Sequence, residues 1–288
     1  MSQTDHPSAT KDARTWAKTI AAYSQPSNAR GSLEFALSLV PFALIWAAMA
    51  VLISHGYWAG LILALPAAGF LLRLFMIQHD CGHEAFFRRR TSNNWVGRTI
   101  GVLTLTPYDC WRRSHALHHA STGNLDARGF GDVDTLTVRE YMTRGKMGRL
   151  FYRLYRHPVV LLGLGPAYLF LLRHRLPIGL MRAGTIYWVS ALGTNLATAL
   201  ILGLIAYAFG IGVTLAVFLP VLMVAASTGV WLFYVQHQFV ETHWDAREAW
   251  EFHEHALKGS SHLEMPADLR WFPGNIGLHH VHHLMSRI

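Results

Sequence analysis

The sequence predicts an all-α integral membrane protein. It is expected to have four transmembrane helices in two hairpins, interfacial helices, and a cytosolic cap that is rich in histidine. Hydrophobic residues make up 52% of the 288 residues and charged residues only 15%, which is typical of membrane proteins. Four apolar stretches are long enough to cross a bilayer. Clusters of histidine lie beside these stretches and between them.

The four apolar stretches cover residues 35–54, 57–77, 184–208 and 212–235. An α-helix rises about 1.5 Å per residue, so about 20 apolar residues cross the hydrocarbon core. Arg73, near the end of the second stretch, is the one charged residue in them. Residues 1–34 are polar and have no apolar region of the signal-peptide type, so we expect a cytosolic N-terminal segment.

The basic residues are distributed unevenly along the chain, which carries a formal net charge of +8. Sixteen of the 25 Lys and Arg residues lie between Arg88 and Arg182, and the turns near residues 55–56 and 210–211 contain none. By the positive-inside rule, both termini and the long middle segment are expected in the cytoplasm. Basic and aromatic residues are not interleaved, so no nucleic-acid site is expected.

Residues 1–288 are expected to form a single membrane domain, with a cytosolic cap made of residues 78–183 and 236–288. Residues 158–172 are apolar but number only 15, and arginines flank both ends, which argues against a crossing. We expect this segment, and residues 95–105, to lie in the membrane interface. A crossing by residues 158–172 would separate the last histidine cluster from the others.

Three histidine clusters accompany the predicted spans: HDCGH at residues 79–83, HALHH at 115–119 and HHVHH at 279–283. Spacings of three and four residues place imidazoles on one face of a helix. Neutral imidazole is the commonest metal-ligating side chain. Because each hairpin returns the chain to its starting side, all three clusters are expected to face one compartment and to build a single metal site.

Eight histidines occupy the repeated positions of these clusters and are the predicted metal ligands and catalytic residues: His79, His83, His115, His118, His119, His279, His282 and His283. Eight ligands exceed the four of a tetrahedral zinc site, so two metal ions are expected to share them. Iron, zinc, copper and nickel all accept imidazole. A site at the mouth of an apolar bundle could act on a lipid chain. Breaking an unactivated C–H bond favours redox iron with O2.

Other histidines and a cysteine near the clusters are expected to have different roles. His280 breaks the spacing pattern and is expected outside the ligand set. His243 and His262 could lie either against the ligands or on the surface. His255, in the EFHEH run, is expected on the solvated surface. Cys81, inside the first cluster, is expected to be a packing residue.

A metal-bound imidazole usually donates its other N–H to a carboxylate or a carbonyl group. Residues close in sequence to the clusters that could supply such a partner are Asp80, Glu84, Asp109, Asp126, Asp134, Glu241 and Asn275. Taken singly, each is better explained as a solvated capping residue. Trp111, Trp244 and Trp271 could wall a substrate tunnel or form an interfacial aromatic belt.

From about Phe35 to its C-terminus, the chain resembles the membrane fatty acid desaturases, and among them the bacterial acyl-lipid type that introduces Δ12-like double bonds. The motifs that carry the resemblance are HDCGHEAFF, WRRSHALHHASTGNLD, FYVQHQF and GSSHLEMPADLRWFPGNIGLHHVHHL. The resemblance implies four transmembrane helices under a cytosolic cap, and a non-haem di-iron centre held by histidines. It also implies O2 as co-substrate, with two electrons for each double bond. His237, in FYVQHQF, becomes an expected ninth ligand.

The resemblance also sets expectations about location and partners. The protein would lie in a bacterial inner membrane. The substrate would be an acyl chain linked to a membrane lipid. The chain has no fused cytochrome b5 signature, so electrons would come from a separate ferredoxin or cytochrome b5. Members of the family usually continue for several tens of residues beyond the third box, whereas this sequence ends at Ile288. A truncated C-terminus is therefore one expectation.

Two other functions are weighed against desaturation. A related di-iron membrane hydroxylase or ketolase of alkanes, carotenoids or sphingoid lipids would use the same ligands, and its reaction would differ only after the first hydrogen abstraction. A metal transporter is less favoured, because transport sites usually place ionisable residues near the bilayer midplane. The predicted spans contain no His, Asp or Glu.

Overall fold

The computed structural model describes residues 15–16, 18–129, 131 and 133–288. In these residues the regular elements are all helical, and the two β-bridges are isolated ones. The predicted all-α class is confirmed. In the expected N-terminal segment, residues 1–14 and 17 lie outside the described ranges, and the residues from Asn28 onward belong to the first long helix.

Among the described residues, four helices are long and apolar enough to cross a membrane, as predicted. They are α2 (Asn28–Ser54), a combined helix over Trp58–Gly82 that ends in α3 (Ala64–Gly82), α9 (Thr185–Phe209) and α10 (Ile211–His237). Three of them extend beyond the apolar stretches into polar sequence. Backbone hydrogen bonding continues past the last apolar residue, and α2 starts where the Ser27 side chain accepts a hydrogen bond from the Arg30 N–H.

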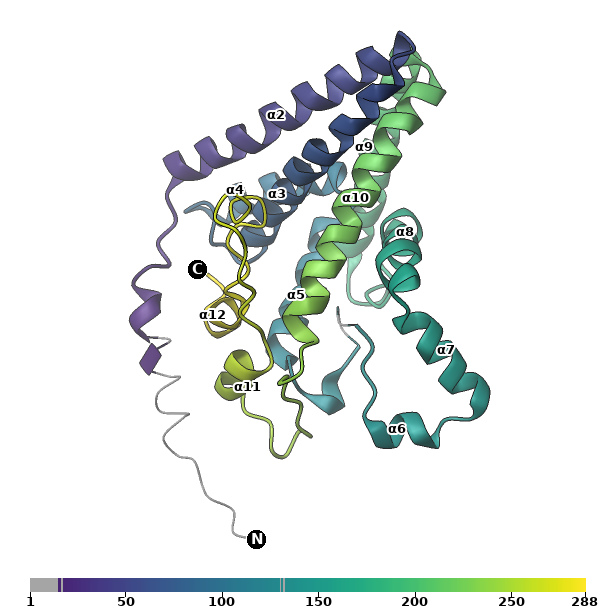
Figure 1. Ribbon diagram of the computed structural model, residues 1–288. Helices are drawn as coiled ribbons and strands as arrows, with labels where there is room; N and C mark the ends of the chain where they lie inside the picture. The colour runs from purple at the N-terminus through teal and green to yellow at the C-terminus, as the bar shows by residue number, and fades with distance from the viewer. Residues whose placement is uncertain (1–14, 17, 130, 132) are drawn as a thin grey trace.

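The two hairpin turns lie together at one end of the molecule, as Figure 1 shows. There α2 leads into α3, and α9 leads into α10. At the opposite end lie α5 (Tyr108–Ser121), α11 (Phe252–Lys258) and α12 (His279–Leu284). The arrangement therefore collects the histidine-bearing elements at one end of the bundle.

The helix α3 is the most buried of the four and occupies the centre of the hydrophobic core. Its Leu74 and Ile77 are fully buried and share that core with Met49 of α2 and Val217 of α10. The first histidine cluster follows directly at the end of α3. Its position is therefore fixed by the best-packed helix of the bundle.

An ion pair joins α2, α3 and the C-terminal segment. The Arg73 guanidinium lies 2.9 Å from a carboxylate oxygen of Glu34 and stacks over the ring of Trp271, whose indole N–H donates to the same oxygen at 3.1 Å. Arg73 thus has a partner within the protein, which is the usual way of placing a charge in a membrane helix. Trp271, which from the sequence could wall a tunnel or form an aromatic belt, thus takes part in this ion-pair contact.

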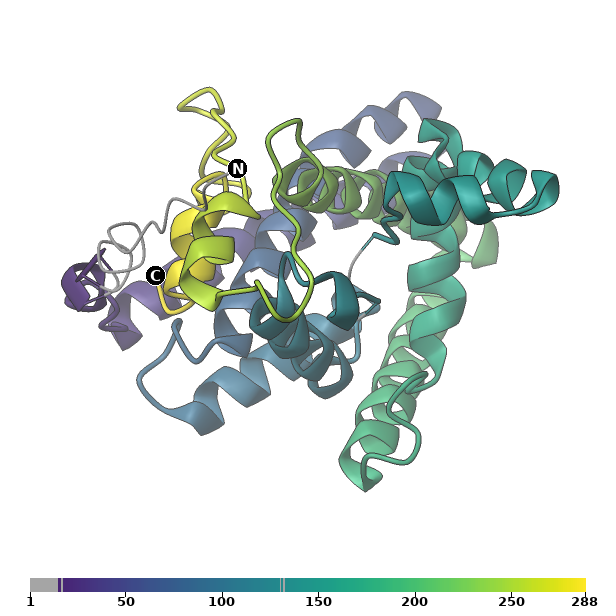
Figure 2. The same ribbon diagram turned by 90° about the horizontal axis from the view of Figure 1, so that it is seen from below.

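The short apolar segment does not form a long spanning helix. It follows α7 (Lys146–Arg156) and consists of two π-helical turns, Val160–Leu164 and Tyr168–Leu172, with α8 (Gly165–Ala167) between them. In Figures 1 and 2, α7 and α8 lie to one side of the bundle, away from α12. Histidines from before and after this segment meet in one place. If α9 and α10 form a spanning hairpin, this meeting requires that the segment does not cross. Of the other segment expected in the interface, residues 95–105, residues 95–103 belong to α4 (Arg90–Leu103).

Candidate metal centre

Four elements bring histidines to the cap end of the bundle. His79 lies in the last turn of α3 and His83 immediately follows that helix. The α5 helix carries the second cluster, and α12 carries the third. The last residue of α10 is His237. Each segment presents its imidazoles at the end of a helix or along one helical face, as the spacing requires.

All of the predicted ligands fall into two groups, in each of which the potential ligand atoms lie within 4.8 Å of one another. The five-histidine group contains His79, His83, His115, His119 and His282. The four-histidine group contains His118, His237, His279 and His283. The groups share both α5 and α12, so they are adjacent. The structure therefore brings together residues from four separate parts of the sequence.

Ring nitrogens within each group face one another closely. In the five-histidine group, Nε2 of His115 lies 3.0 Å from Nε2 of His83 and 3.1 Å from Nε2 of His119. In the four-histidine group, Nε2 of His237 lies 3.1 Å from that of His118 and 2.9 Å from that of His279. Nitrogens bound at about 2.1 Å to one ion would lie about 3.0–3.4 Å apart. The spacing in both groups fits a bound metal ion.

His282 gives an independent indication that a cation belongs here. It is only 4% exposed, and neither of its ring nitrogens has a hydrogen-bond partner among the described residues. A buried polar atom without a partner costs free energy. Metal ligation would satisfy one of these nitrogens, so the residues present fit the metal that the histidine pattern implies.

Burial favours the neutral form that metal binding requires. It lowers the pKa of six histidines outside the spans well below the ordinary value of 6.5, and neighbouring imidazoles lower it further: His83, His115, His119, His279, His282 and His283. Neutral imidazole has a free lone pair for a metal. The site is therefore poised to bind a cation at neutral pH.

Contacts made by the Nδ1 atoms orient several of these rings. Nδ1 of His79 lies 3.0 Å from the Asp80 carboxylate, and Nδ1 of His237 lies 3.2 Å from the Gly259 carbonyl oxygen. Nδ1 of His283 lies 3.3 Å from Oγ1 of Thr122. Such partners fix the tautomer and leave Nε2 free for the metal. Of the candidate carboxylates, Asp80 has this position.

Two other candidate partners, Glu84 and Asp109, pair with arginines of the cap and not with the histidines. Glu84 pairs with Arg112 at 2.6 Å and with Arg90 at 3.0 Å. Asp109 makes a bidentate pair with Arg98, with both distances at 3.0 Å. These pairs hold α5 against the chain that follows α3, so they position the site indirectly.

His280 and Cys81 lie outside both groups. His280 is half-buried, with its ring centroid 5.8 Å from that of His262. The expectation that His255 lies on the solvated surface is wrong, because its side chain is fully buried. The last four residues of the EFHEH run begin α11, in which His255 and Ala256 are buried and Lys258 is exposed. The polar residues of this run did not indicate that His255 is buried.

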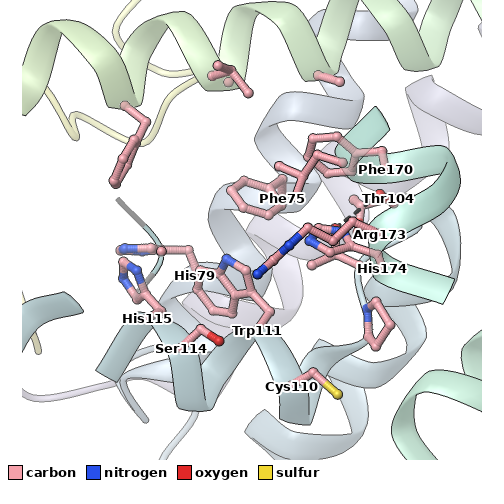
Figure 3. Close-up of a pocket in the computed structure, with 18 of the residues that line it drawn as sticks. Phe75, His79, Thr104, Cys110, Trp111, Ser114, His115, Phe170, Arg173 and His174 are labelled. Atoms are coloured by element: carbon pink, nitrogen blue, oxygen red, sulfur yellow. Dashed lines mark hydrogen bonds between the residues drawn. The ribbon is translucent and has the colours of Figure 1, made fainter. Parts of the chain in front are cut away.

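A cavity of about 350 Å³ opens onto the histidine groups. Phe75 and Met76 of α3 and Leu222 and Phe233 of α10 contribute apolar walls. In Figure 3, His79 and His115 lie at one side of the cavity, and Phe170 and His174 lie at the other. The site therefore adjoins a space suited to a hydrocarbon chain.

Trp111 forms a wall of this cavity, which is one of the two roles open to it from the sequence. Its ring stacks on that of His115 with a centroid distance of 4.6 Å and an interplanar angle of 16°. A Cβ at Gly82 would lie 2.8 Å from this indole, so a glycine is needed at that close approach. Trp111 thus holds both a ligand ring and the cavity wall in place.

His174 also lines the cavity, a position that its sequence context did not indicate. Burial, together with the adjacent Arg175 and Arg173, lowers the pKa of His174 to about 3. The ring is therefore neutral at physiological pH. A histidine between two arginines resembles a surface residue, so the sequence carries no signal for this placement.

Acidification is expected to destabilise the metal-free protein below about pH 6.5. Above that pH the ligand histidines are neutral in both the folded and the unfolded state, so stability is flat. Below it the unfolded chain binds protons that the buried rings do not, at a cost of up to about 1.4 kcal/mol per pH unit for each histidine.

Thermal unfolding in detergent, measured between about pH 7.5 and about pH 5.5, tests this expectation. The midpoint should fall steadily over the lower half of the range. A midpoint that stays constant would show that these rings are already charged in the folded protein, or that they are not buried.

The fold and the site together define a class: an integral membrane protein with two histidine groups that can bind metal, next to an apolar cavity. A model of the family described as fatty acid desaturase matches residues 56–288. The chain is 40% identical over 272 residues to a fatty acid desaturase of Bacillus subtilis (strain 168), covering 94% of this chain and 76% of the relative.

Two further relatives carry more specific names. One is an sn-1 acyl-lipid omega-3 desaturase (ferredoxin) of Nostoc sp. (strain 36), 29% identical over 223 residues, covering 75% of this chain and 60% of the relative. The other is an sn-1 oleoyl-lipid 12-desaturase of Arthrospira platensis, 33% identical over 86 residues, covering 30% of this chain and 24% of the relative. The chain belongs to the fatty acid desaturase family, whose members are oxidoreductases, and the predicted resemblance is confirmed.

Proposed function

We propose that this protein is an O2-dependent desaturase of acyl chains linked to membrane lipids. The observation that carries the proposal is the contact between the two histidine groups and the apolar cavity. The reaction would convert –CH2–CH2– to –CH=CH–, while O2, two electrons and two protons become two molecules of water. The names of the acyl-lipid relatives support a lipid-linked substrate.

The histidines would hold two iron ions, one in each group. Bound iron would supply the redox chemistry that activates O2 for C–H cleavage. The five-histidine and four-histidine groups together comprise the proposed catalytic and metal-binding residues. Their buried, neutral rings favour metal binding over protonation, and Asp80, Gly259 and Thr122 set the orientation of three of them.

The cavity would hold and orient the acyl chain. Phe75, Leu222 and Phe233 provide apolar contacts along it, and Trp111 fixes the distance between chain and ligands. These walls exclude water from the reacting carbons. Holding one pair of methylenes beside the metal ions is how an enzyme can select among chemically equivalent C–H bonds.

We further propose that residues 1–288 act as one membrane domain, with residues 78–183 and 236–288 as its cap. The cap and both termini would face the cytoplasm of a bacterial cell, since the basic residues concentrate there. A separate ferredoxin or cytochrome b5 would deliver electrons. The Nostoc relative, whose name specifies ferredoxin, favours the first of these donors.

Fatty acid profiling of a host that expresses the protein tests the reaction type. We expect membrane lipids with one additional double bond in a fraction of their acyl chains, detected by mass spectrometry of the methyl esters. Products that gain an oxygen atom without a new double bond would contradict desaturation and favour the hydroxylase alternative. An empty-vector strain is the control.

A further inference from the structure

A third group of metal-binding side chains lies in the cap, apart from the nine histidines. It consists of His243, Asp245 and His255, whose potential ligand atoms lie within 4.8 Å of one another. The first two residues follow α10, and the third lies in α11. Two imidazoles and a carboxylate are a ligand set typical of zinc sites that keep a fourth position for water.

The carboxylate oxygen of Asp245 lies between the two imidazoles. Its Oδ2 is 3.0 Å from Nε2 of His243 and 3.2 Å from Nε2 of His255. Ligands at about 2.0–2.2 Å from a tetrahedral ion lie about 3.3 Å apart. The three side chains therefore already have the separation of ligands that share one ion.

The contacts of the His255 ring are compatible with a cation bound at Nε2. Its Nδ1 lies 2.9 Å from the carbonyl oxygen of Glu251, and the Glu251 N–H donates to the same nitrogen at 3.3 Å. In the tautomer that the shorter contact favours, the ring proton is on Nδ1. Nε2 then presents a lone pair to the Asp245 carboxylate.

In that tautomer, a positive charge between Nε2 and the Asp245 carboxylate would stabilise both groups. The side chain of His255 is fully buried, and its Nε2 has no hydrogen-bond partner among the described residues, even though Asp245 is near. The contact therefore has the distance of an ion pair without the alignment of a hydrogen bond. A metal ion satisfies both atoms, because its bonds do not need a proton on the line between them.

The backbone holds these ligands rigidly. Asp245 donates its N–H to the Gly123 carbonyl oxygen and accepts from the Leu125 N–H, both at 2.9 Å. Gly123 has a φ of +77°, and a Cβ there would lie 2.6 Å from the ring of His255. A residue with a side chain would thus be excluded from this position. The loop that follows α5 is therefore shaped around the group.

The group also lies close to the ligands of the proposed iron site. Thr122, next to Gly123, contacts His283 of the four-histidine group through its hydroxyl and accepts the indole N–H of Trp250 at 2.9 Å. His243, by contrast, is about half exposed (49%). An ion could reach the group from solvent on that side.

We propose that His243, Asp245 and His255 bind one Zn²⁺ ion that clamps the segment after α10 to the loop after α5. The fourth position would be filled by water, since His243 is solvent-accessible. The clamp would hold the C-terminal end of α5, which carries three of the proposed iron ligands. This site is independent of whether the enzyme desaturates or hydroxylates its substrate.

Equilibrium dialysis of the purified, iron-loaded protein against buffered Zn²⁺ tests the proposal, with zinc and iron counted separately by mass spectrometry. The wild-type protein should bind one more zinc per chain than the Asp245→Asn and His243→Gln variants. The matched control is His253→Gln, a histidine of the same α11 helix outside the group, which should bind zinc as the wild type does.

Iron content reports separately on the nine-histidine site and on folding, and should be the same in all four proteins. His243→Gln is the decisive variant, because a half-exposed side chain can be replaced without disturbing the core. Equal zinc binding by this variant and the wild type would overturn the proposal. So would a wild-type protein that binds no zinc beyond the amount bound by Asp245→Asn.

Discussion

Replacing either His118 or His282 with alanine should reduce double-bond formation by more than about 100-fold, since even residues that only orient metal ligands cost 10–100-fold when lost. The two residues belong to different groups, His118 to the four-histidine group and His282 to the five-histidine group. Each removal should therefore disable one of the two proposed ions. Fatty acid profiles of expressing cells give the activity.

The matched control is His280→Ala, which removes a histidine from the same HHVHH cluster but from outside both groups. This variant should keep most of the activity, because its ring packs near His262 and not among the ligands. All three variants should insert into the membrane at wild-type levels. Full activity in the His118 or His282 variant would refute the assignment of that group.

Filling the cavity should block the reaction without disturbing the metal site. Ala226 of α10 is buried and lines the cavity, so Ala226→Phe would place a ring where the acyl chain is proposed to lie. A misplacement of about 1 Å can cost about 100-fold in rate. We therefore expect activity to fall by at least about 10-fold, or the double bond to move, while iron content stays the same.

Ala199→Phe is the matched control, since it adds the same volume on an exposed position of α9. It should resemble the wild type in both activity and iron content. If Ala226→Phe kept the wild-type rate and product pattern, the acyl chain would have to bind elsewhere. Loss of iron in Ala226→Phe alone would instead indicate a disturbed helix packing.

Much of the fold could be predicted because the bilayer imposes simple rules on a sequence. The apolar stretches predicted the four long helices, and the arginines on both sides of residues 158–172 argued against a fifth crossing. The helix ends were less predictable. The hydrogen bonds that extend α2 back to Asn28 and α10 forward to His237 depend on caps and on tertiary contacts that hydropathy does not record.

The histidine site could also be predicted in outline. The spacing of the histidines places imidazoles on one helix face, and each hairpin returns the chain to its starting side, so the clusters lie on one side. How the ligands are shared between the two groups could not be predicted. His118 and His119 are neighbours in sequence but belong to different groups, since successive residues of a helix point about 100° apart. Only the positions of α3, α10 and α12 around α5 decide this division.

The third group escaped sequence reasoning for a different reason. His243, Asp245 and His255 have no regular spacing, and the EFHEH run resembles a solvated segment. Their convergence depends on α11 folding back against the loop after α5, where Asp245 pairs with the backbone of Gly123 and Leu125. Contacts of this kind between irregular segments leave no periodic signal.

The iron content of the purified, active protein tests the central claim most directly. If the five-histidine and four-histidine groups each hold one ion, metal analysis should find close to two irons per chain. Activity should rise in proportion to iron up to that value. Full activity with one iron per chain or with none would contradict the di-iron site, whatever the fatty acid products.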